Sequence, residues 1–212
     1  MNNNSVIESP VLKGLDKLAE QFKIEGASLE ELFDYFGVEG HYLLITFMIL
    51  PFLQPIPLWG LSTPFGILIS VVAFFAHINK KPLLPQKWKT QKINGNTILK
   101  IRDAGHIVFE KILFMIYPRM EFLFNGPFKY FNTGIIIFNG ILLALPLPVP
   151  FSNAFPGWVI LFQSLAHLEK DGLFIIISYV QALLCILFFG ALLLGFESGL
   201  QYFMTSISSL LT

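Results

Sequence analysis

The sequence predicts an all-α integral membrane protein: two homologous proline-broken helical hairpins, interfacial amphipathic helices and one long C-terminal transmembrane helix. Of the 212 residues, 54% are hydrophobic and only 13% are charged, whereas ordinary globular domains carry about 25% charged residues. Two hydrophobic stretches are each interrupted by clustered prolines, and residues 173–196 form a continuous apolar run. We therefore expect residues 1–212 to form a single membrane domain.

Composition and motifs also limit the classes of function that the sequence favours. Lysine plus arginine and aspartate plus glutamate number 14 each, so the zero net charge predicts no nucleic-acid partner. The sequence contains no His-Glu-x-x-His, Gly-x-Ser-x-Gly or P-loop motif, and its four histidines form no cluster with Cys185 that could hold a metal. We therefore expect no catalytic residue, metal or cofactor. Whether the chain is an enzyme stays open, and the missing motifs weigh against it.

Residues 1–40 are predicted to form amphipathic helices on the cytoplasmic side. Ser9 before Pro10 is a typical helix start. Apolar residues then recur at helical spacing between charged ones, so this helix is too polar to span a membrane. Residues 28–31, Ser-Leu-Glu-Glu, form a capping box that begins a second helix, and Gly37 is a typical C-terminal residue for it.

The first hairpin is predicted over residues 41–79. Its first apolar run, 42–53, is about a dozen residues long, whereas a full membrane span needs about 20. Pro55 and Pro57 break the helix, and a second apolar run covers 64–78. Both ends of such a hairpin emerge on the same side of the membrane. The sequence leaves open whether its tip crosses the bilayer or is re-entrant.

Residues 80–127 are predicted to form a basic cytoplasmic loop and an interfacial helix. The segment 79–129 carries ten of the fourteen lysines and arginines, and the positive-inside rule places such a segment in the cytoplasm. Residues 97–117 show helical periodicity with interspersed charges, so we expect this helix to lie at the interface and to end at Pro118.

The second hairpin is predicted over residues 128–168, and residues 172–196 are long enough to span the membrane. The two hairpins share the order Pro-x-Pro, Pro, Gly, Ala-His, which ends at His77 in the first and His167 in the second. Repeats with broken helices in corresponding positions indicate a transport site between them. A purely architectural duplication is the alternative, and we favour a parallel over an inverted arrangement.

Prolines inside a hydrophobic helix free backbone groups, which at membrane depth must be buried in protein or line a wet cavity. We therefore expect the two breaks to face each other and to form a substrate path. For the polar side chains, an interhelical hydrogen bond is the alternative role. The candidate residues of the path are Gln54, Pro55, Pro57, Ser62, Thr63, Pro148, Pro150, Asn153 and Gln163.

Two further groups of residues are candidates. His77 and His167 are either symmetry-related proton carriers or residues that are favoured electrostatically at helix C-termini. Arg119 contacts lipid phosphate or forms an ion pair, and Glu169 and Asp171 lie in a charged turn that by default is a solvated connector.

Several motifs occur in the order seen in a known family. They are the capped opening 28–32, the turn 37–40, the break 55–63, Pro118-Arg119, the second break 148–153 and the turn 168–173. In this order they resemble the ExoD family, membrane proteins linked to bacterial exopolysaccharide synthesis. Two positions depart from the family pattern: Glu39 replaces the usual arginine and Leu83 replaces an aromatic residue.

The resemblance implies a multi-pass protein of the bacterial inner (plasma) membrane that serves exopolysaccharide synthesis. Our first hypothesis is a small transporter or permease, a homodimer in the membrane lipid, with its path at the breaks. The second is a non-transporting assembly factor that binds the polysaccharide synthesis machinery through the basic segment. A lipid-linked sugar enzyme is the weakest hypothesis, because catalytic carboxylates and metal ligands are missing from the motifs.

Overall fold

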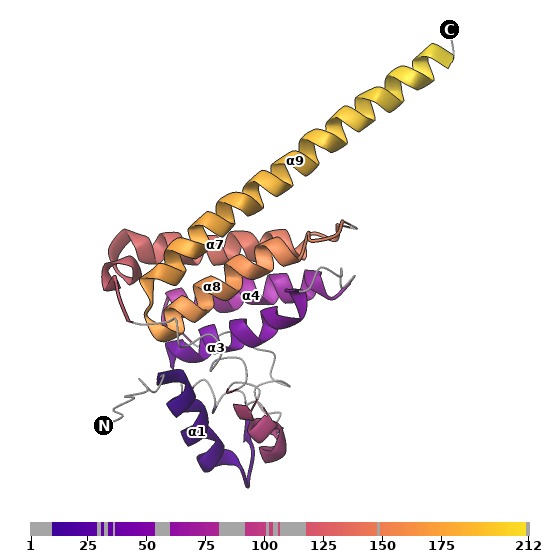
Figure 1. Ribbon diagram of the computed structural model, residues 1–212. Helices are drawn as coiled ribbons and strands as arrows, with labels where there is room; N and C mark the ends of the chain where they lie inside the picture. Colours follow the sequence, from indigo (N-terminus) through magenta and orange to yellow (C-terminus); the bar gives the residue numbers. More distant parts are fainter. Residues whose placement is uncertain are drawn as a thin grey trace, which may run out of the picture.

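The computed structural model describes residues 10–28, 31, 34–35, 37–53, 60–80, 92–100, 102–103, 106, 118–147 and 149–210. The described chain is almost entirely helical, as predicted, apart from one short pair of strands. Figure 1 shows three parts: an N-terminal layer around α1, a bundle of α3, α4, α7 and α8, and the long helix α9, which projects beyond the bundle. Gln54, Pro55, Pro57 and Pro148 lie outside the described residues.

The N-terminal layer is built from α1 (Pro10–Phe22) and from the described segment 92–100. β1 (Ala27–Ser28) pairs antiparallel with β2 (Lys92–Ile93). This pairing joins the residues that follow α1 to the segment 92–100. Leu18, Ala19 and Ile98 are buried in a small apolar cluster between the segments. The amphipathic pattern of α1 is therefore explained by a protein contact on its apolar face.

The predicted capping box is present. The Ser28 backbone N–H donates to the Glu31 carboxylate at 2.7 Å, and the Glu31 N–H donates to Ser28 Oγ at 3.2 Å. Because donors from Ser28 favour the ionised carboxylate, the pKa of Glu31 is below its usual value. Beyond Glu31, only residues 34–35 of the predicted helix before Gly37 are described, and they are helical.

Two pairs of helices follow in the chain, and we refer to them as the first and second hairpins. The first comprises α3 (Val38–Ile49), the short 3-10 helix η1 (Leu50–Phe52) and α4 (Ser62–His77). The second comprises α7 (Gly126–Ala144) and α8 (Ala154–Glu169), and the 3-10 turn η2 (Glu121–Phe124) precedes it. α3 packs on α8 and α4 packs on α7, so the hairpins lie side by side.

Helix α9 runs from Gly172 to Leu210, which is longer than the predicted 172–196. Within the described residues, the segment Gly172–Phe196 is the one helix long and apolar enough to cross a membrane. Its first half packs against α8 and α7, and the remainder extends away from the bundle (Figure 1).

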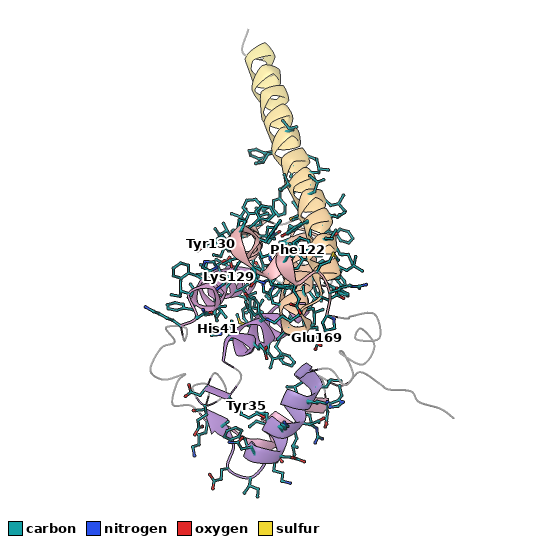
Figure 2. The ribbon with its side chains drawn as sticks, turned by 90° about the vertical axis from the view of Figure 1, so that its left-hand side faces the viewer. Tyr35, His41, Phe122, Lys129, Tyr130 and Glu169 are labelled. Atoms are coloured by element: carbon teal, nitrogen blue, oxygen red, sulfur yellow. The ribbon has the colours of Figure 1, made fainter. Side chains whose placement is uncertain are left out.

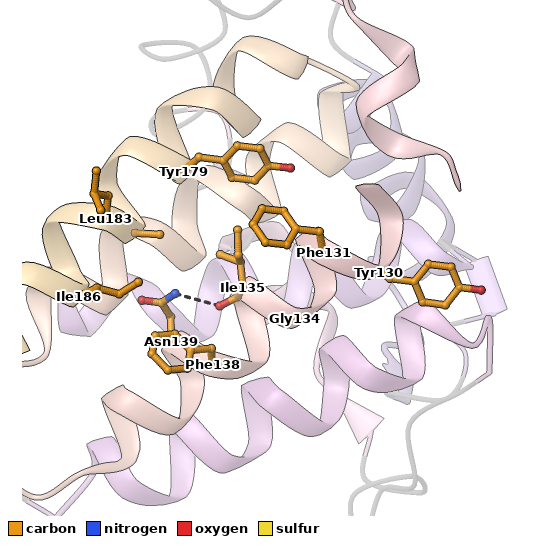
Figure 3. Close-up of a pocket in the computed structure, with 10 residues that line it drawn as sticks. Tyr130, Phe131, Gly134, Ile135, Phe138, Asn139, Tyr179, Leu183 and Ile186 are labelled. Atoms are coloured by element: carbon orange, nitrogen blue, oxygen red, sulfur yellow. Dashed lines mark hydrogen bonds between the residues drawn. The ribbon is translucent and has the colours of Figure 1, made fainter. Parts of the chain in front are cut away.

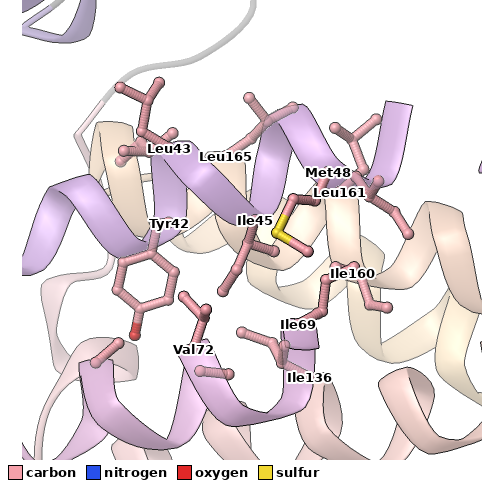
Figure 4. Packing of buried hydrophobic residues seen from close by; sticks show 14 of the residues in the cluster. Tyr42, Leu43, Ile45, Met48, Ile69, Val72, Ile136, Ile160, Leu161 and Leu165 are labelled. Atoms are coloured by element: carbon pink, nitrogen blue, oxygen red, sulfur yellow. The ribbon is translucent and has the colours of Figure 1, made fainter. Parts of the chain in front are cut away.

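The interior of the bundle is filled with apolar side chains. Figure 4 shows Ile45 of α3, Ile69 and Val72 of α4 and Ile136 of α7 meeting in one layer, and none of these four is exposed. Ile160 of α8 packs into the same cluster. The described space between the hairpins is therefore a continuous hydrophobic core.

Helices α4 and α7 approach each other closely at two glycines. A Cβ atom on Gly66 would collide with the Gly140 carbonyl oxygen and lie 2.7 Å from the Ala144 nitrogen. Ser70, one turn from Gly66, donates its hydroxyl to the Gly66 carbonyl at 2.8 Å. Small residues permit this backbone contact, which is the usual way that helices pack in membranes.

Replacing Gly66 by alanine should destabilise the protein by about 1–3 kcal/mol, because the new methyl group meets backbone atoms that cannot rotate away. Gly134→Ala is the matched control on α7: nothing lies within 4 Å of its added Cβ, and alanine favours a helix by about 1 kcal/mol over glycine. Chemical unfolding in detergent, followed by circular dichroism, measures both. Equal stability of the two variants would contradict the close contact.

Candidate functional site

The described residues that flank the two predicted breaks meet at one end of the bundle. In a continuing helix, the carbonyl of Ala144 would accept a hydrogen bond from residue 148, but Pro148 has no N–H. Thr63, which lies beside the other break, donates its hydroxyl to the Ala144 oxygen at 2.8 Å instead. A side chain of the first hairpin thus satisfies a backbone group that the second break leaves free.

A second contact joins the other two helices at the same end. An added Cβ on Gly157, in the first turn of α8, would lie 3.4 Å from the Phe52 carbonyl oxygen and 3.5 Å from a Leu53 methyl group. The 3-10 helix η1, which follows α3, therefore rests on the beginning of α8. None of the described residues among 49–66 and 144–157 is charged.

Several predicted path residues lie at this end. Ser62 is buried at the start of α4 beside Thr63. Asn153 is buried before α8, and its backbone carbonyl accepts the Gly157 N–H at 3.0 Å. Ser152 donates its hydroxyl to the Leu147 oxygen at 3.3 Å, while Pro150 is exposed in the turn. Of the side chains at the second break, the Ser152 hydroxyl is therefore turned toward the backbone of the break itself.

Gln163 is not brought together with these residues. It lies ten positions after Asn153, about 15 Å along α8, and faces α9, where its Nε2 donates to Ser178 Oγ at 2.7 Å. Its Oε1 is buried without a hydrogen-bond partner among the described residues. This geometry is the interhelical hydrogen bond that was the alternative for the buried amides.

His77 and His167 lie at the opposite end of the bundle and differ in their surroundings. His77 is half-buried, with Nδ1 3.0 Å from the Thr133 hydroxyl. His167 is buried: its Nδ1 donates to the Gln163 carbonyl at 2.8 Å, and its ring stacks on Tyr42 with centroids 4.3 Å apart. Their role as proton carriers stays a prediction, and their environments are not equivalent.

The same end carries basic side chains. Lys80 follows α4, Lys129 lies in the first turns of α7, and Lys170 ends α8. Figure 2 looks onto this end and shows Lys129, Tyr130 and Glu169 on it. Glu169 is buried, so it is not the solvated connector that a charged turn suggests by default.

Arg119 and Asp171 form a two-pronged ion pair. Arg119 Nε and Nη2 donate to the two Asp171 oxygens at 2.7 and 3.0 Å. Asp171 is fully buried, and one of its oxygens also accepts the Leu173 N–H at 2.8 Å at the start of α9. The Gly172 N–H donates to the Arg119 carbonyl at 2.9 Å, so residues around 119 hold the turn between α8 and α9.

Sequence reasoning did not single out the polar side chains that join the helices here. Asn132 is fully buried: its Nδ2 donates to the Leu123 oxygen at 2.8 Å, and its Oδ1 accepts the Tyr179 hydroxyl at 2.6 Å. It thereby links η2, α7 and α9. An asparagine inside an apolar run was the available signal, because such a residue must find partners.

Arg119→Ala should destabilise the protein by about 3 kcal/mol, because it leaves the buried Asp171 carboxylate without its cation. Arg102→Ala is the matched control, since the Arg102–Asp103 ion pair is exposed and should contribute less than about 1 kcal/mol. Unfolding curves of both variants in the same detergent test this. A loss for Arg119→Ala no larger than for Arg102→Ala would show that the ion pair does not hold the turn.

Comparisons with known proteins place the sequence in a family. The family described as "Exopolysaccharide synthesis, ExoD" matches residues 11–191. Protein ExoD of Rhizobium meliloti is 31% identical over 186 residues, which cover 84% of this chain and 77% of that protein. An uncharacterized protein of Synechocystis sp. is 27% identical over 132 residues, 62% of each chain. No solved structure matches the chain. The chain therefore belongs to the ExoD family of exopolysaccharide synthesis.

Proposed function

We propose that the chain is a multi-pass inner-membrane protein that serves exopolysaccharide synthesis as a small permease, with its substrate path at the paired helix breaks. The observation that carries this proposal is the contact between the breaks through the Thr63 hydroxyl and the Ala144 carbonyl. When the hairpins part and this hydrogen bond opens, the half-helix ends would offer amide and carbonyl groups to an ion or a small polar solute.

The outer surface of the bundle supports a membrane location. Large apolar side chains are exposed on α4, α7 and α9, and a soluble protein rarely leaves such a continuous surface uncovered. They include Ile67, Val71 and Phe74 on α4, Phe138 and Ile141 on α7, and Val180, Leu183 and Leu187 on α9.

The distribution of charge supports an orientation. Lys80, Lys129 and Lys170 lie at the end of the bundle away from the breaks, which by the positive-inside rule is the cytoplasmic end. The 19 residues of α7 span about 28 Å, close to the thickness of the hydrocarbon core. In this orientation the breaks lie near the outer face of the membrane.

Passage requires the hairpins to part. Phe52, Ile49 and Ile160 lie inward of the breaks and are at most 1% exposed, so this conformation is closed on the inner side of the breaks. The contacts of α3 with α8 and of α4 with α7 are the two surfaces along which the hairpins could separate. A closed form of a permease is expected to be packed in this way.

The packed core also favours the second candidate, an assembly factor for a polysaccharide synthase. A rigid bundle with a basic face could hold a synthase without moving any solute. The segment 80–102 would then be the binding surface, since its lysines complement an acidic partner.

Asn153→Ala and Gln54→Ala should each reduce solute flux about tenfold, because each removes hydrogen-bonding groups beside a break. The assay uses proteoliposomes of the full chain with trapped proton- and potassium-sensitive dyes. Lys100→Ala, on the exposed surface of the N-terminal layer, is the control and should leave flux unchanged.

The two candidate functions give opposite results in paired experiments. Flux that is unchanged in Gln54→Ala, Asn153→Ala and Pro148→Ala removes the breaks from the mechanism. Co-purification with a synthase that survives these three changes, but is lost on lysine-to-glutamate changes in 80–102, would establish the assembly factor instead.

A further inference from the structure

An apolar groove of about 710 Å³ runs between α7 and α9. Figure 3 shows its walls: Phe131 and Phe138 on α7, and Tyr179, Leu183 and Ile186 on α9. Gly134 forms the middle of the α7 wall, and nothing lies within 4 Å of the position of its missing Cβ. The groove exists because α7 presents no side chain there while α9 turns away from the bundle.

The level at which the groove lies within the membrane determines the chemistry of its occupant. Tyr179 and Ile186 lie 7 and 14 positions after Gly172, about 10 and 21 Å along α9. When α9 spans the membrane, this interval lies within the hydrocarbon core, which is about 30 Å thick. Water is excluded at this depth, so the groove holds either a lipid chain or another helix.

The lining fits a lipid chain better than a helix. Membrane helices associate through small residues and interhelical hydrogen bonds. Five of the ten residues that line this groove are phenylalanine, leucine or isoleucine, two are tyrosine, and only Gly134 and Ala182 are small. Its one amide side chain, Asn139, is buried. The Asn139 Nδ2 donates to the Ile135 carbonyl at 2.9 Å (Figure 3), and its Oδ1 has no hydrogen-bond partner among the described residues. Its volume is also within the usual range for a ligand pocket, about 300–1,000 Å³.

The open end of the groove points toward the basic end of the bundle. Tyr130 lines this end, is 69% exposed, and its ring lies 4.7 Å from the ring of His77. Lys129 precedes it, and no described carboxylate forms an ion pair with this lysine. A lipid whose chain fills the groove would therefore have its headgroup beside the Lys129 ammonium group.

We propose that the groove between α7 and α9 is a binding site for one hydrocarbon chain of an anionic phospholipid, whose phosphate lies at the basic end near Tyr130 and Lys129. The site requires that the chain be embedded in the membrane, but it does not depend on a permeation path. Loss of flux at the breaks and loss of lipid from the groove are thus separate results.

Photolabelling of the full chain in nanodiscs tests the site. The nanodiscs contain phosphatidylcholine with a minor share of phosphatidylglycerol that carries a diazirine in its acyl chain, and mass spectrometry maps the labelled residues. The unmodified chain should be labelled chiefly on the α7 and α9 residues of the groove. Gly134→Leu fills the hollow without meeting another atom at its Cβ and should lower this labelling about tenfold.

Gly190→Leu is the matched control. Nothing lies within 4 Å of its Cβ position either, and it follows the groove by one turn of α9, so labelling of the groove should not change. Circular dichroism and unfolding curves establish that both variants are folded. The map of photolabelled residues in the unmodified chain tests the site even if a variant does not fold.

Three results would overturn the proposal. The first is labelling spread evenly over the exposed faces of α4 and α9 in the unmodified chain. The second is groove labelling that Gly134→Leu leaves unchanged. The third is a chemical cross-link from Phe138→Cys, in a Cys185→Ala background, to a second copy, which would make a helix the occupant.

Equal labelling by diazirine-phosphatidylcholine would refute the preference for an anionic headgroup, and displacement by inorganic phosphate would show that free phosphate suffices there.

Discussion

The hydrogen bond from Thr63 to the Ala144 carbonyl is the constraint on which the arrangement of the hairpins depends. The bond is partly buried, and a buried carbonyl that loses its helical partner and stays unpaired costs about 1–3 kcal/mol. The beginning of α4 must therefore lie at the end of α7. One turn further along, Gly66 and Gly140 let the two backbones touch, so the break and the helix contact specify the same pairing.

Polar contacts also fix the opposite end of the bundle, but there they involve charge. Arg119 and the buried Asp171 hold the turn that begins α9, and Asn132 ties η2 to α7 and α9. One end is therefore uncharged and built from backbone interruptions, and the other is basic and held by an ion pair. This polarity gives the proposed orientation its physical basis, and it separates the proposed permeation path from the proposed cytoplasmic surface.

The sequence predicted the features that local chemistry decides. Apolar periodicity and apolar runs predicted a helical protein, which the described chain is, and the spacing of Ser28 and Glu31 identified a capping box that the structure contains. The sequence could not predict which neighbouring helix Gln163 faces, because that depends on how α9 packs against α8. For the same reason the sequence did not show that Glu169 is buried, or that Gly134 leaves a groove.

The most direct test of the account is the proximity of the two breaks in the membrane. Leu61 and Leu145 are exposed beside the Thr63–Ala144 hydrogen bond. Cysteines at these two positions, in a Cys185→Ala background, should be joined within one chain by a short bifunctional thiol reagent, whereas a pair at Leu61 and Ile78, at opposite ends of α4, should not. Equal cross-linking of the two pairs, or none for Leu61 with Leu145, would contradict the claim that the breaks satisfy one another.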